Sequence, residues 1–562
     1  AGEERGWVPI DRSFGSPLAR GRGRKGGRRR SGLFSHCNKA LAGFGIVVFH
    51  RRQMSSEKTV LSPEAEELPE DDAAAGGRFA RPGIDEPFDA YLIDHTYDEC
   101  FQPNLWSRPH YAKLHELLSS LPVEEVQRRQ LACEQSFLHQ GITFTVYGKD
   151  SSTEKIIPTD LLPRIITGAE WAAIEAGLKQ RIAALNLFLA DIYADGKAGR
   201  DGIVPADLVY GAKHFRKEMV GVAVPRGAYV SVCGTDLIRN EAGQFVVLED
   251  NLRVPSGVSY MLANREVVRR AFPALFRESR VRPIERYPQL LLETLRSLAP
   301  PGRENPRIVL LTPGVFNSAY YEHTFLARQM GIELVEGRDL VVSDGRVCMR
   351  STGGLEQVDV IYRRLDDDFI DPLVFRADSV LGVPGLFDCY ARGTVVIANA
   401  LGNGVADDKA VYAYVPALIK YFLGEEAILP NVETYLCRDP KQLDHVLANL
   451  DKLVVKAVGE SGGYGMLVGP HASAGERAAF GELVKADPDN YIAQPTISLS
   501  RAPCFVDGKF ESRHVDLRPF ILTGAETVVV PGGLTRVALR RGSLVVNSSQ
   551  GGGSKDTWVL SE

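Results

Sequence analysis

The chain has 562 residues with a formal net charge of −5, of which 44% are hydrophobic and 24% are charged. These values are typical of a globular protein long enough for about two to four domains, and the charge balance provides no basic field for nucleic acid. No apolar run approaches the roughly 20 residues that a membrane-spanning helix needs. We therefore expect neither a nucleic-acid partner nor a membrane anchor.

The eight cysteines are widely spaced, with no Cys-x-x-Cys pair and no His at metal-ligand spacing. This distribution is typical of unlinked thiols in a reducing compartment and not of a disulfide framework. We therefore expect a cytoplasmic protein in which Cys233 and Cys504 are small apolar fillers.

Residues 1–53 differ from the rest, because they hold twelve Lys and Arg against three acidic residues. The basic stretch is too long for a secretory signal peptide, and no small-residue cleavage site follows it. A nucleic-acid-binding tail is one interpretation. We favour another, in which the native chain starts at Met54 and the preceding residues are a translation artefact or a disordered extension. Residues 55–77 are acidic and rich in Ala, Glu and Pro, so we expect residues 1–87 to form a disordered extension, basic and then acidic.

The globular part is expected to begin near Phe88, with helical patterns over about 112–128 and 169–194. In the second pattern, apolar residues recur every three or four positions and share one face: Ile174, Leu178, Ile182, Leu185, Leu189 and Ile192. Residues 227–258 have the pattern of strands joined by a turn at Asn240–Gly243.

Three oxygen-bearing side chains fall on these predicted strands. Glu249 and Asn251 are two residues apart and point to the same face, and Asp236 can lie on the paired strand across the turn. Two carboxylates and an amide suit a Mg²⁺ ion that bridges nucleotide phosphates, although Glu-x-Asn taken singly is more often a solvated strand edge. Arg253, just beyond, could hold a substrate carboxylate or form a salt bridge with Asp250.

From residue 307 onward, buried strands alternate with helices, and the expected strands are 308–311, 332–335, 358–362 and 394–398. This alternation predicts a parallel sheet with a ligand at the carboxyl ends of its strands. The side chains expected to face an acceptor substrate there are Asn317, Tyr320, Glu322, Arg363 and Arg364. A surface ion-pair cluster of the two arginines with Asp366–Asp368 is the alternative.

A glycine-rich loop separates two apolar runs in residues 453–469. Lys456 ends the first run, and the loop contains Gly459, Gly462, Gly463 and Gly465. This order predicts strand, loop and strand. Glycines let backbone N–H groups approach phosphates, and the lysine would add a point charge. The loop is not a P-loop, in which Gly-Lys-Ser/Thr opens a helix, and taken alone it is more often a simple turn.

Further segments carry groups that suit a nucleotide. Asp407-Asp408-Lys409 opens a predicted helix at 410–422, and a short predicted strand ends in Gln494 and Pro495, which could read an adenine edge. Residues 516–518 form a strand predicted to be exposed, and the nearby His514 is more often a packing imidazole than a base. A cation, an amide and a second glycine loop follow: Arg536, Asn547, Gly551 and Gly552.

Together these segments resemble the ATP-grasp superfamily, whose usual order is a lysine, a lysine with a glycine loop, a hinge, Asp-x-Arg and then the metal residues. Here the metal segment comes first, as in the circularly permuted ATP-grasp type 2 proteins related to glutathionylspermidine synthetases. The matching blocks are residues 399–409, 516–520, 532–538 and 545–558, and the resemblance covers roughly residues 88–560. Residues Gln102–Ser107 depart from the glycine-containing turn of that family.

The resemblance implies an α/β fold with α+β elements, a circularly permuted ATP-grasp with a pre-ATP-grasp Rossmann-like α/β domain. Residues 88–300 would form a helical region and the permuted metal-binding half. Residues 301–405 would form the pre-ATP-grasp domain, and residues 406–562 the nucleotide-binding half.

The resemblance also implies roles for the candidate residues. The nucleotide would contact Lys409, Lys456, Gly462, Gly463, Tyr464, Gly465, Gln494, Pro495, Gly551 and Gly552. Mg²⁺ would be held by Asp236, Glu249 and Asn251. The transferred phosphoryl group would be near Arg518, Arg536 and Asn547.

The implied activity is ATP-dependent ligation of a carboxylate to an amine through an acyl phosphate, with release of ADP and phosphate. The substrates would be small molecules or peptides, and a helical partner protein is expected from the family's relatives. An ATP-grasp phosphotransferase and a catalytically silent nucleotide-binding scaffold are the alternatives. Every position that should be charged carries a charged residue, with no Lys or Glu replaced by an inert one, which argues against the scaffold.

Overall fold

The computed structural model describes residues 88, 91, 93–147, 152–459, 465–539, 543, 546 and 552–561. The chain divides into two compact units, Ala1–Arg78 and Phe79–Glu562, and all described residues belong to the second. The predictions for residues 1–87 therefore lie outside the described residues. Within the described part, no helix is long and apolar enough to cross a membrane, and its seven cysteines are free and buried.

The centre of the fold is a six-stranded sheet built from two distant parts of the chain. Its strands, in spatial order, are β3 (Thr159–Ile166), β21 (Gly553–Val559), β20 (Thr527–Val537), β19 (Arg518–Thr523), β4 (Val232–Arg239) and β5 (Phe245–Asn251). Neighbouring strands are antiparallel except for β3 and β21, which run parallel. The strands predicted around the Asn240–Gly243 turn are confirmed as β4 and β5.

Two hydrophobic cores lie on the two faces of this sheet. Ile521 of β19 belongs to the core that includes α3 (Gly168–Ile192), whereas its neighbours Phe520 and Leu522 belong to the core that includes α6 (Val258–Ala271). Alternate residues of a strand point to opposite faces, so both faces of the sheet are covered by helices.

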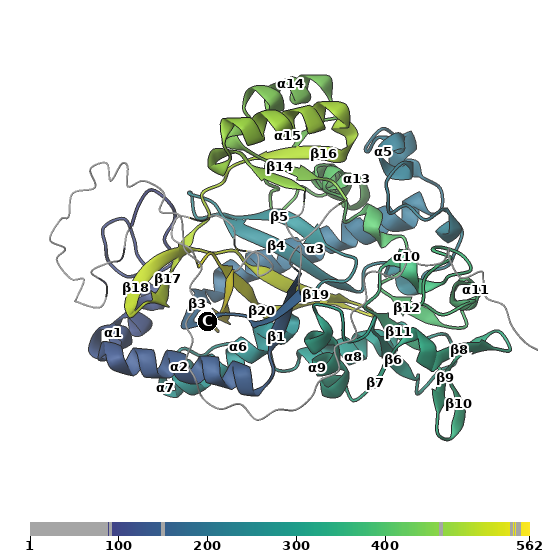
Figure 1. The fold of residues 1–562 in the computed structure, drawn as a ribbon, viewed down its shortest axis with the longest axis horizontal. Coiled ribbons are helices and arrows are strands. Elements are labelled where there is room, and N and C mark those ends of the chain that lie inside the picture. The colour runs from purple at the N-terminus through teal and green to yellow at the C-terminus, as the bar shows by residue number, and fades with distance from the viewer. Residues whose placement is uncertain are drawn as a thin grey trace, which may run out of the picture. The chain divides into compact units, whose positions relative to one another are not determined.

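Helix α3 buries the apolar face that its sequence predicted. All six residues with the three- and four-residue spacing are buried: Ile174, Leu178, Ile182, Leu185, Leu189 and Ile192. The helix begins with a capping box, in which Thr167 accepts a hydrogen bond from the Glu170 backbone N–H and the Glu170 carboxylate accepts from the Thr167 backbone N–H. Figure 1 shows α3 running behind β4 and β5.

Two regions predicted as single helices are each divided in two. The first forms α1 (Ala112–Ser120) and α2 (Val123–His139), because Pro122 keeps the preceding residue extended. The second forms α12 (Lys409–Tyr412) and α13 (Val415–Leu423). Pro416 in the first turn of α13 has no N–H to continue the hydrogen bonds of α12.

A second sheet is parallel, as predicted from the alternation of strands and helices. Its order is β12 (Val396–Ala398), β11 (Val360–Arg363), β6 (Ile308–Leu311) and β7 (Glu333–Val335), all parallel. The predicted strand boundaries are confirmed to within two residues. This sheet is accompanied by α9 (Tyr320–Met330), α11 (Leu386–Ala391), β8 (Leu340–Ser343), β9 (Arg346–Ser351) and β10 (Gly354–Gln357).

A third, antiparallel sheet contains β13 (Tyr435–Leu436), β16 (Tyr491–Pro495), β14 (Leu453–Ala457) and β15 (Met466–Val468). The strand–loop–strand prediction for residues 453–469 is therefore confirmed for the two strands. Helices α14 (Pro440–Ala448) and α15 (Ala474–Ala486) lie over this sheet (Figure 1), and Val446 and Val484 of these helices share a core with Leu453 and Val455.

The remaining elements are shorter or peripheral: α4 (Lys197–Arg200), α5 (Ala206–Tyr210), α7 (Pro273–Glu278), α8 (Tyr287–Ser297), α10 (Asp367–Ile370), β1 (Thr143–Tyr147), β2 (Ser152–Ile156), β17 (Arg501–Val506) and β18 (Lys509–His514). The two strands β17 and β18 form an antiparallel hairpin. The domain boundaries proposed from the sequence stay predictions.

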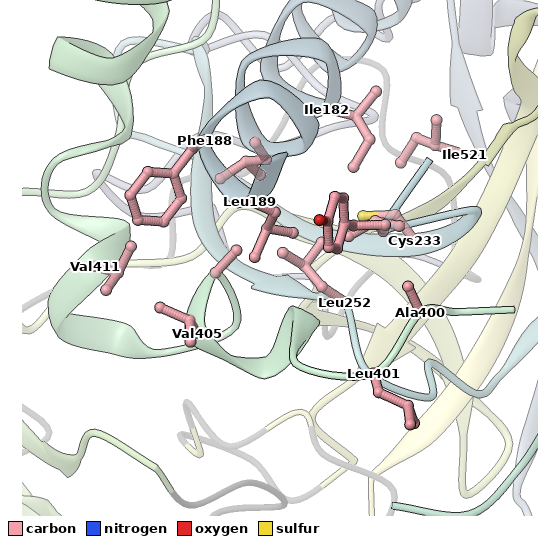
Figure 2. Close-up of a cluster of buried hydrophobic side chains, with 14 of the residues drawn as sticks. Ile182, Phe188, Leu189, Cys233, Leu252, Ala400, Leu401, Val405, Val411 and Ile521 are labelled. Atoms are coloured by element: carbon pink, nitrogen blue, oxygen red, sulfur yellow. The ribbon is translucent and has the colours of Figure 1, made fainter. Parts of the chain in front are cut away.

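One apolar core fixes the backbone segments that carry the polar side chains of the candidate site. Figure 2 shows Ile182 and Leu189 of α3 close to Cys233 of β4, with side chains from three further segments around them: Leu252, Leu401, Val405, Val411 and Ile521. The burial of Leu252 fixes the chain immediately after β5. Val405 and Val411 likewise hold both ends of the segment that contains Lys409.

A buried ion-pair network attaches the start of the described chain to the central sheet. The Glu99 carboxylate pairs with Arg164 of β3 and, at 3.3 Å, with Arg239 of β4. Ser500 Oγ donates to the same Oε1 atom at 2.7 Å. Both arginines and Glu99 are fully buried, so each charge depends on the others for its stabilisation.

We predict that Glu99→Gln lowers the free energy of unfolding by about 3 to 5 kcal/mol, because it leaves the buried Arg164 without its counterion and Arg239 with Glu170 alone. Asp388→Asn is the matched control, because it removes an exposed ion pair with Arg392 and should cost less than about 1 kcal/mol. Chemical denaturation followed by circular dichroism would measure both. Equal stability of the two variants would contradict the prediction.

Candidate active site

The β4–β5 hairpin places the three predicted magnesium ligands together. In its register Asp236 lies opposite Glu249, and Gly234 lies opposite Asn251. Residues directly opposite one another in an antiparallel pair project from the same face. The carboxylates of Asp236 and Glu249 and the Asn251 amide therefore share one face. Asp236 is fully buried, whereas Glu249 and Asn251 are partly exposed.

Asp250, which lies between the predicted ligands Glu249 and Asn251, anchors β5 to α3. The Asp250 carboxylate receives hydrogen bonds from Arg181 of α3, with Nε to Oδ1 at 2.9 Å and Nη2 to Oδ2 at 2.6 Å. Thr235 Oγ1 donates to Asp250 Oδ1 at 3.1 Å. A one-residue shift of a strand turns every side chain to the other face. The Arg181–Asp250 pair therefore holds Glu249 and Asn251 on the side opposite α3.

Two arginines from the C-terminal strands converge on Asp236. Arg518 Nη2 donates to Asp236 Oδ2 at 2.8 Å, and Arg536 Nη2 donates to the same oxygen at 2.6 Å. Burial alone would raise the pKa of the Asp236 carboxyl, but the charges of Arg518 and Arg536 outweigh it and lower the pKa below its usual range. Asp236 is therefore ionised at neutral pH and joins β4 to β19 and β20.

The prediction that residues 516–518 form an exposed strand is wrong, because Asp516 and Leu517 are fully buried and β19 begins only at Arg518. Arg536 Nε donates to Asp516 Oδ2 at 2.9 Å, so the side chain faces inward to pair with this guanidinium. The nearby His514 is also buried, with Nδ1 2.7 Å from the Leu499 carbonyl oxygen. That contact is typical of a packing imidazole.

Lys456 projects from the face of β14 opposite its helices. Its neighbour Val455 packs in the core beneath α14 and α15, so strand alternation turns Lys456 to the other side. Lys456 Nζ donates to Gln494 Oε1 at 2.7 Å, and Gln494 Nε2 donates to Thr434 Oγ1 at 3.0 Å. Gln494 thus positions the lysine through its side-chain amide. Its contact with adenine stays a prediction, as does that of Pro495, which ends β16.

Lys409 brings a second ammonium group to the same place. It opens α12, where Asp408 caps the helix by accepting a hydrogen bond from the Ala410 backbone N–H, and its Nζ lies 3.9 Å from Glu249 Oε2. Burial lowers the pKa of Lys456, and the charges acting on it include those of four other candidate residues: Glu249, Lys409, Asp236 and Arg536. These charges are therefore close neighbours, although they come from five different segments of the chain.

Four nucleotide candidates lie outside the described residues, namely Gly462, Gly463, Tyr464 and Gly551, as does the phosphoryl-site candidate Asn547. Gly465 is described and has a φ of +64°, and its carbonyl oxygen accepts a hydrogen bond from the Ala457 backbone N–H at 3.1 Å. This bond closes the glycine loop directly after Lys456. Gly552 is described and buried beside β21.

Two candidates at the parallel sheet are committed to internal contacts. Glu322 is fully buried, where it accepts from the Gly257 backbone N–H at 2.8 Å and from Arg364 Nη2 at 3.1 Å. Arg363 pairs with Asp367 at 2.7 Å and donates from Nε to a backbone carbonyl at 2.8 Å. The alternative of a surface ion-pair cluster is correct for the Arg363–Asp367 pair and wrong about its location, because both arginines are buried. The internal contacts do not favour the predicted substrate roles of Glu322 and Arg363.

The other acceptor-site candidates are more open. Asn317 and Tyr320 are partly exposed in the segment that follows β6, and Asn317 Oδ1 accepts from the Ala319 backbone N–H at 2.9 Å. One interpretation predicted a salt bridge between Arg253 and Asp250. This salt bridge does not form, because Asp250 is paired with Arg181. Arg253 Nε donates to Asp407 Oδ2 at 2.7 Å.

Sequence reasoning gave no role to Asn399, which links the parallel sheet to the β4–β5 hairpin. Its Oδ1 accepts from the backbone N–H groups of Ser231 and Val232, each at 2.8 Å. Its Nδ2 donates to the Leu252 carbonyl oxygen at 2.6 Å. The side chain is buried and holds both the start of β4 and the end of β5. Its place in the 399–409 block was the signal available in the sequence.

A family model for circularly permuted ATP-grasp type 2 proteins matches residues 163–538. The chain belongs to this family. It is 56% identical to an uncharacterized protein of Synechocystis sp. over 84% of this chain and 98% of that protein. It is 50% identical to an uncharacterized protein of Mycobacterium tuberculosis, over 84% of this chain and 85% of that protein.

A Frankia alni protein named "Putative glutamate--cysteine ligase 2-3" is 43% identical over 82% of this chain, which spans 54% of that relative's length. Among solved structures, a glutathione synthetase-like effector from Globodera pallida in its apo form matches with a TM-score of 0.51 and 13% identity. The match covers 78% of this chain and 98% of the effector. At this identity the structural likeness supports the ATP-grasp fold alone.

The donor set of the ATP-grasp hairpin fits a magnesium ion. Mg²⁺ prefers oxygen ligands, and Asp236, Glu249 and Asn251 offer two carboxylates and an amide on one face. The Asn251 Nδ2 atom is buried with no hydrogen-bond partner among the described residues, so this amide nitrogen is not committed to another group there. No cluster of three or more His, Cys, Asp or Glu side chains in the described part could hold a metal. The amide of Asn251 is therefore needed to complete the set.

The pKa of Lys456 gives a pH prediction. Because burial lowers this pKa, the ammonium loses its proton below the ordinary lysine range, whereas phosphate oxygens bound to it would favour the charged form. We predict that affinity for a non-hydrolysable ATP analogue falls about tenfold per pH unit as pH rises through the lowered pKa, with uptake of one proton on binding.

Calorimetry in buffers of different ionisation enthalpy would measure both the affinity and the proton uptake. Lys456→Arg is the control, because a guanidinium stays charged throughout this range, and its affinity should not fall in this way. The same pH profile in both proteins would contradict the assignment to Lys456.

Proposed function

We propose that the protein is an ATP-dependent carboxylate–amine ligase. ATP would phosphorylate a substrate carboxylate to an acyl phosphate, and an amine would then attack the acyl carbon to form an amide and release phosphate. The observation that carries the proposal is the meeting of Lys409, Lys456 and Arg536 with the carboxylates of Asp236 and Glu249. Such a site offers cations for phosphate oxygens beside oxygen ligands for the accompanying metal ion.

The name of one similar protein supports the same class. The Frankia alni relative is named "Putative glutamate--cysteine ligase 2-3", and a ligase of this name joins a carboxylate to an amine. Because the chain spans about half of the Frankia protein, the choice of acid and amine does not follow from that name.

The residues have separate tasks in this reaction. Lys409 and Lys456 would hold the ATP phosphates, while Arg518 and Arg536 would neutralise the negative charge of the phosphoryl group in transfer. When bound, Mg²⁺ at Asp236, Glu249 and Asn251 would supply a cation that shields the phosphate oxygens from the attacking carboxylate. No nucleophilic side chain is required, so catalysis would depend on positioning and charge.

In the ligand-free protein Asp236 serves as the counterion of Arg518 and Arg536. A nucleotide brings its own negative charge to the arginines, and its metal ion brings positive charge to the carboxylate. Binding of the two together would therefore exchange one set of ion pairs for another without leaving a buried charge unpaired. This exchange favours joint binding of ATP and Mg²⁺.

We predict that a non-hydrolysable ATP analogue binds the full chain much more tightly with Mg²⁺ than without it. Glu249→Gln should remove most of this metal effect, because a neutral amide attracts the cation less than a carboxylate does. Lys456→Ala should weaken binding in both conditions. Isothermal calorimetry would measure all three proteins, and failure of the folded wild type to bind nucleotide in either condition would contradict the proposed function.

We further predict ADP release that depends on a carboxylic acid, with the acyl phosphate trapped as a hydroxamate by hydroxylamine. Lys456→Ala and Arg536→Met should each lower kcat/KM about 100- to 1,000-fold, because each removes a charge positioned at the phosphates. Lys485→Ala is the control, because Lys485 is an exposed lysine paired with Glu482 on α15. Phosphate transfer to a hydroxyl, with no hydroxamate, would show a phosphotransferase instead.

A further inference from the structure

A segment that the sequence did not single out lies beside Gly459, at the start of the glycine loop. Residues 212–217 follow α5, and within them His214 packs against the backbone of Gly404. A Cβ atom placed on Gly404 would lie 2.7 Å from the His214 Cβ and 3.1 Å from the Arg253 Cδ. Contacts that close require glycine, so His214 and Arg253 are seated together on the same backbone turn.

The Arg253 guanidinium is held from two sides. Its Nε donates to Asp407 Oδ2 at 2.7 Å, and its Nη1 lies 3.3 Å from His214 Nε2 and 3.9 Å from Asp366 Oδ1. Asp407 is itself fixed, since Oδ1 accepts from the Leu252 backbone N–H at 2.5 Å. Among the described residues, Nη2 makes no hydrogen bond, and 18% of the side chain is exposed. One amino group of a rigid cation is therefore left for an outside acceptor.

The contact with Arg253 determines the state of His214. A guanidinium has donors and no acceptor, so His214 Nε2 must accept, and the ring is neutral with its proton on Nδ1. Burial lowers the pKa of His214, and Arg253 lowers it further, which agrees with a neutral ring. Asp407 and Asp367 act in the opposite direction, and Arg216 acts in the same direction as Arg253.

Arg253 borders the phosphate-binding residues. It follows the metal ligand Asn251 by two positions, and its partner Asp407 precedes Lys409 by two. The backbone N–H of Lys409 in turn donates to the Val458 carbonyl oxygen at 3.3 Å, directly before the glycine loop. Arg253 is therefore attached, through its own strand and through Asp407, to the two segments that carry the predicted metal and phosphate groups.

We propose that Arg253 Nη2 binds the carboxylate of the acid substrate and that His214 is a positioning residue, which holds the guanidinium in place together with Asp407. The inference rests on the proposed function, in which a carboxylate is activated next to ATP. His214 keeps Arg253 from rotating toward Asp366, so the free amino group keeps one direction. Its neutral ring adds no second charge that would compete for the substrate.

The test uses acetate as the smallest carboxylate probe, with the phosphate site filled by Mg²⁺ and a non-hydrolysable ATP analogue. Saturation-transfer NMR on the full chain would give the acetate Kd. We expect Arg253→Ala to abolish the binding and His214→Leu to weaken it about tenfold, as for the loss of a hydrogen bond to a charged group. His214→Gln should restore it, because the glutamine Oε1 can accept from Nη1.

Arg216→Gln is the matched control, because it loosens the same segment by removing its pairs with Asp367 and Asp368 but leaves both proposed residues intact. It should bind acetate like the wild type. The inference is overturned if the wild type binds no acetate, if Arg253→Ala binds it equally well, or if His214→Gln behaves like His214→Leu.

Failure of the proposed function would look different from failure of this inference. It would appear as the absence of carboxylate-dependent ADP release, while binding of acetate at Arg253 could persist. For an acid that supports turnover, His214→Leu should raise its KM about tenfold and leave the KM for ATP unchanged. An increase in the KM for ATP alone would instead place Arg253 at the nucleotide and overturn the inference.

Discussion

The Asp236 carboxylate is the interaction on which the site depends. It is fully buried, yet it is ionised because Arg518 and Arg536, which stand 282 and 300 residues away in the chain, direct their guanidinium groups at it. A buried carboxylate without these partners would be strongly unfavourable. The β4–β5 hairpin and the C-terminal strands therefore cannot separate without exposing or neutralising three charges. This explains how one sheet can be assembled from two distant parts of the chain.

Around this centre, the charged side chains divide into those that fix the scaffold and those that face the site. Arg181 with Asp250 and Arg364 with Glu322 are buried pairs in which each charge has its partner. Lys456 has only the neutral amide of Gln494 as its hydrogen-bond acceptor in the described structure, and burial lowers its pKa. In the scaffold pairs each charge has an opposite charge beside it, whereas Lys456 is a cation that an anionic ligand would neutralise.

The sequence predicted the local features of the site well. Alternation along a strand was enough to place Glu249 and Asn251 on one face, and the Asn240–Gly243 turn placed Asp236 opposite Glu249. The amphipathic spacing of α3 and the strands of the parallel sheet were also correct. Two helices were predicted as single elements because the apolar pattern continues across Pro122 and Pro416, whereas the missing N–H of proline interrupts the hydrogen bonds.

Features that depend on distant partners were not predictable in this way. Glu322 and Arg363 have the residue types of a substrate site, but their partners in the fold make them internal supports. Asp250 was a candidate partner for Arg253 by proximity in sequence, and Arg181 of α3 occupies it instead. His214 has no motif around it and gained its significance only from its contact with Arg253.

By itself, the sequence determined which local elements form, the order of the motifs and the family to which they belong, because periodicity, glycine content and residue spacing are local properties. Only the tertiary structure decided which charges are paired and which remain open to a ligand. Ion pairs join residues that can be hundreds of positions apart, and their strength depends on burial and distance, which exist only after the chain has folded.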